Sequence, residues 1–206
     1  QFKNSSTEKM VFKAKDMEAG KYATQLFSTA TTELEASKRT LSQGNYTEAY
    51  EHSKNAANAA KQAYDTAPAA KSEADFNTAE QKFKVATENE GKRTNASLYQ
   101  KIQDNLEKAR KYHSRTKKNY KLIIDSSNQV IDDVKTLLAE VTKLADKEVT
   151  EATMIFDDAR RNEAETRAPD AWIKAKALVD ESLKLRSAEQ YYKAIEKAKE
   201  AQNQAN

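Results

Sequence analysis

The amino-acid sequence predicts an all-α protein, an elongated bundle of antiparallel helical hairpins around a long central helix. Two observations lead to this prediction. Only three Gly and two Pro interrupt the 206 residues, and the chain is rich in Ala, Glu, Lys and Gln, which lose little on entering a helix. The chain is 38% hydrophobic and 33% charged. This gives little material for a thick core, so we expect residues 1–206 to form a single elongated helical domain.

The first hairpin is predicted within residues 10–61. Small and apolar residues recur every three or four positions, are interrupted by the sequence SQGN, and then resume the same period. They are Ala23, Phe27, Ala30, Leu34, Ser37, Tyr46, Ala49, Tyr50, Ser53, Ala56 and Ala60. Gly44 suits the left-handed conformation that ends a helix. Tyr46 is then expected to be a packing residue just past a turn.

The same pattern returns at residues 155–206. A shift of 145 residues pairs the two stretches without a gap, from Met10 and Ile155 to Lys61 and Asn206. Identical pairs include Ala30/Ala175, Ser37/Ser182, Tyr46/Tyr191, Ala49/Ala194 and Ala56/Ala201. The chain therefore reads as a repeat of helical hairpins.

A third, diverged copy is predicted at residues 74–113 from fewer matches. Phe76, Ala79 and Phe83 match the first copy at a shift of 49 residues. Tyr99, Ile102, Leu106 and Ala109 match it at a shift of 53, which pairs Tyr99 with Tyr46.

A central spine helix is predicted at about residues 116–165, the most apolar stretch of the chain. Its two neighbouring stripes predict contacts on two sides. One holds Val130, Val134, Leu137, Val141 and Leu144, and the other Ile131, Leu138, Ala145, Val149, Ala152, Phe156 and Ala159. Pro68 and Pro169 are expected where new helices begin, because the first turn tolerates the missing N–H.

The sequence offers few residues suited to catalysis, and we predict that the protein is not an enzyme. It has no Cys and two His, and it lacks a Gly-rich phosphate loop, a G-x-S-x-G elbow and an H-E-x-x-H pair. Glu48 and His52 are four residues apart on a predicted helix, but two ligands do not make a metal site. We therefore predict no catalytic residue, no cofactor and no metal.

One segment departs from an otherwise balanced charge. The net charge is +3, which argues against a dedicated binder of nucleic acid or membrane surfaces. Residues 108–121, KARKYHSRTKKNYK, nevertheless carry seven basic residues and no acid. Such a segment could hold phosphate, an anionic glycan or an acidic partner, although a solvated helix face is the interpretation that we favour. The candidate partner-binding residues are Lys108, Arg110, Lys111, Tyr112, Arg115, Lys117, Lys118, Tyr120 and Lys121.

The spacing of alanine and tyrosine resembles an uncharacterised family of bacterial cell-envelope domains, often lipoproteins and sometimes found beside peptidoglycan-binding modules. The resemblance rests on Ala168-Pro169 followed by Ala175, and on Tyr191, Ala194, Ala198, Ala201 and Ala205. It implies export and a scaffold role, with membrane attachment only through an N-terminal lipid anchor outside this chain. A weaker resemblance, to the tetratricopeptide repeat, rests on GNYTEAYEHSKNA at residues 44–56, without the spacing of 34 residues.

Two functions follow as hypotheses. The first is a non-enzymatic scaffold, spacer or adhesion module of the bacterial cell envelope that binds another protein or an envelope polymer. The second is a soluble helical-repeat adaptor that binds a peptide or ligand in a groove lined by tyrosines and one tryptophan. The groove residues would be Tyr46, Tyr50, Tyr191, Tyr192 and Trp172.

Overall fold

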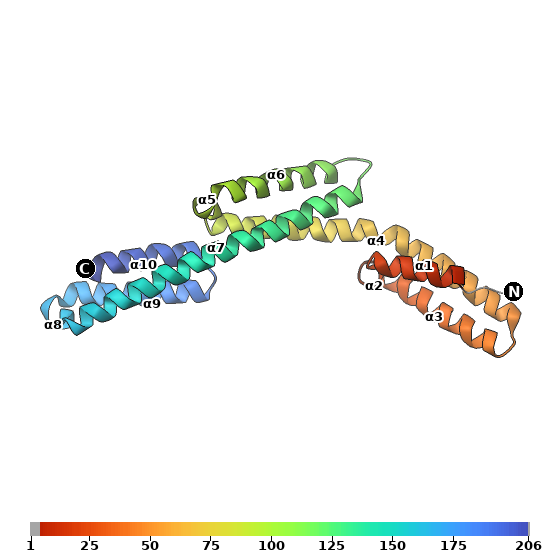
Figure 1. The fold of residues 1–206 in the computed structure, drawn as a ribbon, viewed down its shortest axis with the longest axis horizontal. Helices are drawn as coiled ribbons and strands as arrows, with labels where there is room; N and C mark the ends of the chain where they lie inside the picture. Colours follow the sequence, from red (N-terminus) through yellow and green to blue (C-terminus); the bar gives the residue numbers. More distant parts are fainter. Residues whose placement is uncertain (1–4, 206) are drawn as a thin grey trace. The chain divides into compact units, whose positions relative to one another are not determined.

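The computed structural model describes residues 5–205, whose regular elements are all helices (Figure 1). The predicted all-α class is confirmed, since no strand occurs in this part of the chain. The chain divides into two compact units. The first comprises the residues up to Asn77 together with 109–125, and the second comprises 78–108 and 126–206. Each unit has its own clusters of buried residues.

Three helices lie side by side in the first unit: α1 (Ser5–Asp16), α3 (Thr24–Ser42) and the first part of α4 (Tyr46–Glu88). Buried hydrogen bonds join them. Thr7 Oγ1 of α1 lies 2.9 Å from Ser53 Oγ of α4. In the same way, a serine of α3 donates to a backbone carbonyl of α4.

Alanine fills the interior of this first unit. Side chains so small let helix axes approach to about 8 Å, the short end of the usual range. One cluster consists of Ala14, Ala19, Ala63 and Ala67, and another of Ala30, Ala59 and Ala60. Larger side chains, among them Leu26 and Phe27, are half-buried against the first cluster. The alanine stripe predicted from the sequence is therefore the core.

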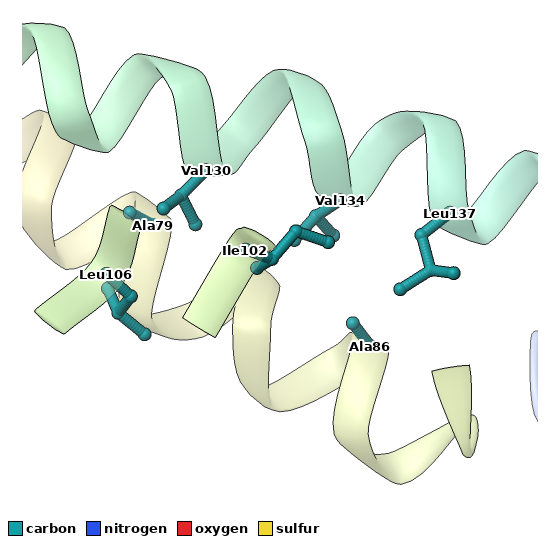
Figure 2. Packing of buried hydrophobic residues seen from close by; sticks show 7 residues of the cluster. All are labelled: Ala79, Ala86, Ile102, Leu106, Val130, Val134 and Leu137. Atoms are coloured by element: carbon teal, nitrogen blue, oxygen red, sulfur yellow. The ribbon is translucent and has the colours of Figure 1, made fainter. Parts of the chain in front are cut away.

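The second unit has two cores that share one helix. The helix is α7 (Tyr120–Arg161). One core lies along its earlier part and the other along its later part, and residues of both predicted stripes, such as Val130 and Ile131, meet in the same core. The prediction that the two stripes contact neighbours on two sides is therefore wrong. In one core, shown in Figure 2, α7 packs against the end of α4 and α6 (Ala96–His113) through Ala79, Ala86, Ile102, Leu106, Val130, Val134 and Leu137. In the other it packs against α9 (Pro169–Ser187) and α10 (Tyr191–Ala205) through Val149, Ala152, Val179, Ala194, Ala198 and Ala201.

A corner of the backbone recurs three times. Its first residue is a glutamate in the left-handed conformation, at Glu18, Glu90 and Glu163, with φ of 56°, 50° and 60°. Each glutamate precedes a four-residue helix, namely α2 (Ala19–Tyr22), α5 (Gly91–Thr94) and α8 (Ala164–Arg167). A residue outside the helical region follows, and then a long helix begins. The corners are 72 and 73 residues apart.

Elements on both sides of the corner recur as well. An aromatic residue stands four positions after the break in each copy, at Phe27, Tyr99 and Trp172. The next helix starts at a tyrosine in each copy, at Tyr46, Tyr120 and Tyr191. We name the three copies the first, second and third repeat, after the corners at Glu18, Glu90 and Glu163. The first and third keep the 145-residue shift seen in the sequence: α3 and α9 have the same length of 19 residues.

Four local expectations from the sequence differ from the structure. Pro68 lies inside α4 rather than at a helix start, whereas Pro169 is the first residue of α9 as expected. The spine helix α7 is shorter than the predicted 116–165 at both ends. Tyr46 is 68% exposed, so its assignment as a packing residue is wrong. Finally, Tyr99 takes the place of Phe27 in the repeat and not that of Tyr46, because the corner at Glu90 precedes it.

Candidate functional site

The basic segment 108–121 consists of the end of α6, a turn and the first residues of α7. Asn119 caps the start of α7, where its Oδ1 accepts a hydrogen bond of 3.2 Å from the backbone N–H of Leu122. Cations are favourable at the end of α6, because the C-terminus of a helix carries a partial negative charge. Residues 109–121 of the segment belong to the first unit and Lys108 belongs to the second.

His113 is held by neighbours on α4 and in the turn, all within the first unit. Its ring stacks on Phe76, with the centroids 4.3 Å apart, and its Nε2 lies 2.7 Å from Glu73 Oε2. Lys118 Nζ lies 3.2 Å from the same histidine nitrogen and 3.7 Å from the Glu73 carboxylate. One ring nitrogen cannot donate to Glu73 and accept from Lys118 at once. Donation to the charged carboxylate is the stronger interaction.

The Glu73 carboxylate neutralises part of the basic segment. Its pKa is lowered, chiefly by the hydrogen bond from His113 and further by the nearby Lys118 ammonium. Because Glu73 is about half exposed, solvent screens this charge interaction. The sequence did not predict Glu73 and Phe76 as partners of His113. Nothing in the spacing of residues on α4 links them to this histidine, which lies about 40 residues later in the chain.

The other candidate side chains differ in whether another residue of the chain already interacts with their charge. Lys121 pairs with Asp125 at 3.0 Å along α7, and the Arg115 guanidinium lies 5.0 Å over the ring of Tyr112. The ammonium groups of Lys111 and Lys117 are exposed and form no ion pair within residues 5–205. The available positive charge of the segment therefore centres on Lys111, Lys117 and the exposed Arg115.

The remaining candidates are placed as follows. Lys108 donates to Asn105 one turn earlier, at 3.4 Å. Tyr120 is 37% exposed at the start of α7. Arg110 is exposed and already has an interaction partner. The arrangement offers solvated cations and two aromatic rings, which can attract an anionic partner.

The aromatic residues of the alternative groove are placed differently from one another. Tyr46 and Tyr50 belong to the first unit and are 68% and 54% exposed. In the second unit, Trp172 stacks on Phe156 with ring centroids 4.0 Å apart. Tyr192 of the same unit lies under the Arg93 guanidinium, 5.0 Å from its ring centroid. Trp172 is thus a packing residue, whereas Tyr46 and Tyr50 face solvent.

His52 has a structural partner. Its Nδ1 lies 2.7 Å from Glu33 Oε2, which joins α4 to α3. Glu48, the residue considered as a fellow metal ligand, hydrogen-bonds Asn45 instead. Within residues 5–205, no three His, Asp or Glu side chains come close enough to share a metal ion.

The first unit has a groove of about 380 Å³. The residues that line it include the apolar Met17, Pro68 and Ile124 and the basic Lys71 and Lys121. Lys71 is already bound by the Glu18 carboxylate at 3.0 Å. Both cations at the groove are thus engaged with acids of the chain.

Comparison of the chain with protein-family models, curated proteins and solved structures gave no match. In the part of the chain described, none of the helices combines the length and the apolar character needed to cross a membrane.

Proposed function

We propose that the chain is a non-enzymatic helical repeat module of the bacterial cell envelope, acting as a scaffold, spacer or adhesion element. The observation that carries the proposal is the threefold recurrence of the corner, the helix that leaves it and the tyrosine that starts the next helix. Recurring units multiply a surface or a length, as in other repeat proteins.

The residues that recur support this function because they form the turn of the backbone or lie half-buried beside it. The corner glutamate, the small residue after it and the aromatic four positions past the break return in each repeat. Apart from the corner glutamate, the neighbouring charge does not recur: the residue two positions before it is Asp16, Glu88 or Arg161. A repeated binding chemistry would keep such side chains, whereas a repeated framework needs only the packing.

The partner in this proposal is another protein or an envelope polymer that contacts exposed side chains. The cations of the basic segment, Lys111, Arg115 and Lys117, suit an acidic partner. The envelope location follows from the family resemblance alone.

The alternative function, a soluble adaptor, is favoured by one observation. Tyr46 and Tyr50 present two exposed rings one helical turn apart on α4, and exposed aromatic residues often anchor a binding partner.

One experiment separates the two functions. The tagged protein is cross-linked in bacterial cells that produce it, and the envelope and soluble fractions are compared for the wild type and for the double variant Tyr46→Ala/Tyr50→Ala. The scaffold proposal expects cross-links in the envelope fraction with both proteins. Recovery in the soluble fraction, with cross-links that the double variant loses, would instead support the adaptor.

A further inference from the structure

The basic segment 108–121 already binds a carboxylate of the chain itself. Glu73 of α4 places its Oε2 atom 2.7 Å from His113 Nε2 and 3.7 Å from Lys118 Nζ. The histidine ring and the lysine ammonium therefore approach the same carboxylate oxygen, and such charge-assisted contacts are stronger than neutral ones. All three residues belong to the first unit. The contact identifies a carboxylate as a ligand that these two side chains accept.

The two binding side chains are positioned independently of Glu73. The His113 ring stacks on Phe76, with the ring planes inclined by 8° and the centroids 4.3 Å apart, and this contact does not involve the carboxylate. Lys118 directly precedes Asn119, whose side chain caps α7, so the backbone beside this lysine is anchored as well. A ligand that replaces Glu73 therefore meets groups that are already in place, which lowers the cost of ordering them on binding.

The Glu73 side chain is free to turn into solvent. It is 51% exposed, whereas the His113 side chain is 24% exposed. Apart from His113 and Lys118, it interacts with Asn77, one turn later on the same helix. Exposed ion pairs of this kind contribute little to stability, because water solvates the separated charges well. Loss of the Glu73 contact is therefore compatible with the folded state.

Glu73 competes with every carboxylate that approaches His113. Because it belongs to the same chain, its effective concentration there is on the order of millimolar. A single acidic residue of a partner is too dilute to displace it. A run of several acidic residues has an advantage, because its other carboxylates pair at the same time with the exposed cations Lys111, Arg115 and Lys117. Glu73 thus favours partners with clustered acidic residues over those with isolated ones.

We propose that Glu73 is an intramolecular competitor for the partner of the basic segment, and that this partner is an acidic segment of another protein, whose clustered carboxylates replace Glu73 on His113 and Lys118. A carboxylate partner is preferred to a phosphate polymer because a carboxylate occupies this place in the structure. The inference rests on the proposed function, in which the basic segment contacts an acidic partner.

The test measures the binding of fluorescein-labelled hexaglutamate to the full chain by fluorescence polarisation at low salt. Glu73→Gln should raise the affinity by about threefold to fivefold, the upper range for one exposed ion pair. Glu107→Gln is the matched control, because it removes the same charge from an exposed position on α6 beside the segment. It should change the affinity by less than about twofold. Equal gains in the two variants would overturn the inference, since net charge would then explain both.

A double-mutant cycle with Lys118 separates displacement of Glu73 from a general charge effect. In the wild type, Glu73 already interacts with the lysine, so Lys118→Gln should lower the affinity by less than about twofold. In the Glu73→Gln background the ammonium is available to the peptide, and the same substitution should lower the affinity by about threefold to fivefold. Equal losses in both backgrounds would overturn the inference. Tighter binding of hexaphosphate than of hexaglutamate would overturn the choice of a carboxylate partner.

The proposed function fails by a different result. An envelope fraction without the wild-type protein would contradict the scaffold role, whereas the binding of hexaglutamate to the purified chain does not depend on where the protein is located.

Discussion

Gly91 and Leu137 are fitted to each other in the core of the second unit. A methyl group placed on Gly91 would lie 2.7 Å from Leu137 Cδ2 and 3.0 Å from the carbonyl oxygen of Ala86. The counterparts in the first repeat are Ala19 and Ala63, which share one buried cluster. The two repeats thus fill the same space either with two alanines or with a glycine and a leucine.

Gly91→Ala is therefore expected to destabilise the protein by about 1–3 kcal/mol, because the added methyl group overpacks a fixed core. Leu137→Ala alone should cost about 2–5 kcal/mol through the cavity it leaves. The double variant recreates the pair of the first repeat, so its loss should be smaller than the sum of the single losses. Urea unfolding followed by circular dichroism measures all three.

Gly20→Ala is the control for this cycle. Its added methyl group would meet Phe27 at 3.5 Å, an ordinary contact. A helical alanine is favoured over glycine by up to about 1 kcal/mol. Equal effects of Gly20→Ala and Gly91→Ala would show that the fit to Leu137 is unimportant.

Ser127→Ala should stabilise the protein. The Ser127 hydroxyl is fully buried and has no hydrogen-bond partner in the described residues. In the first repeat, the counterpart Ser53 forms a hydrogen bond with Thr7. In the second repeat, the position of Thr7 is taken by Ala79, which offers no partner for Ser127. In the third repeat, the position of the serine itself is taken by Ala198. Removing the orphan hydroxyl should raise the free energy of unfolding by about 1 kcal/mol. Ser53→Ala should lower it by a similar amount, and a loss of stability in both variants would contradict this account.

The pairing of Glu73 with His113 should make stability depend on acid pH. The pKa of Glu73 is lowered in the folded protein from its usual 4.5. The unfolded chain then binds a proton more readily, so this contribution is fully present above pH 4.5 and is lost as the pH falls through the folded pKa. Glu73→Gln should flatten the stability profile below pH 4.5. Glu107→Gln, an exposed control on α6, should leave the profile as in the wild type.

The double variant Lys111→Glu/Lys117→Glu should weaken binding to an acidic polymer such as poly-L-glutamate. Both ammonium groups are exposed and form no ion pair within residues 5–205, so charge reversal removes attraction without breaking the fold. Affinity measured at two salt concentrations should drop, and its salt dependence should become shallower. The matched control is Lys92→Glu/Lys176→Glu, two exposed lysines outside the segment. Equal losses in both double variants would assign the effect to net charge.

The all-α class and the alanine core could be predicted from composition and periodicity, because a stripe such as Ala49, Ala56 and Ala60 has few other uses. The left-handed turn at Gly44, with φ of 83°, was also predictable from residue type. The corners were not. Glutamate gives no sequence signal for positive φ.

The register of the middle repeat escaped prediction for a related reason. An aromatic residue followed by small ones occurs on several helices, so Tyr99 could be aligned with Tyr46 as well as with Phe27. Only the corner at Glu90 fixes the choice. For the basic segment, the sequence identified the cations, whereas the partners that engage some of them, such as Glu73, come from a distant helix.

The central claim, that the chain is built of equivalent repeats, is tested most directly by removing one. Deletion of residues 71–144 joins Ala70 to Ala145, the counterpart of Lys71 on α7, and leaves the corners at Glu18 and Glu163. Deletion of residues 71–146 is the control, since two further residues turn the following helix by about 200°. The account predicts that the in-register chain keeps the helicity per residue of the full chain and unfolds cooperatively in urea, while the control does neither. Equal loss of helicity in both chains would contradict it.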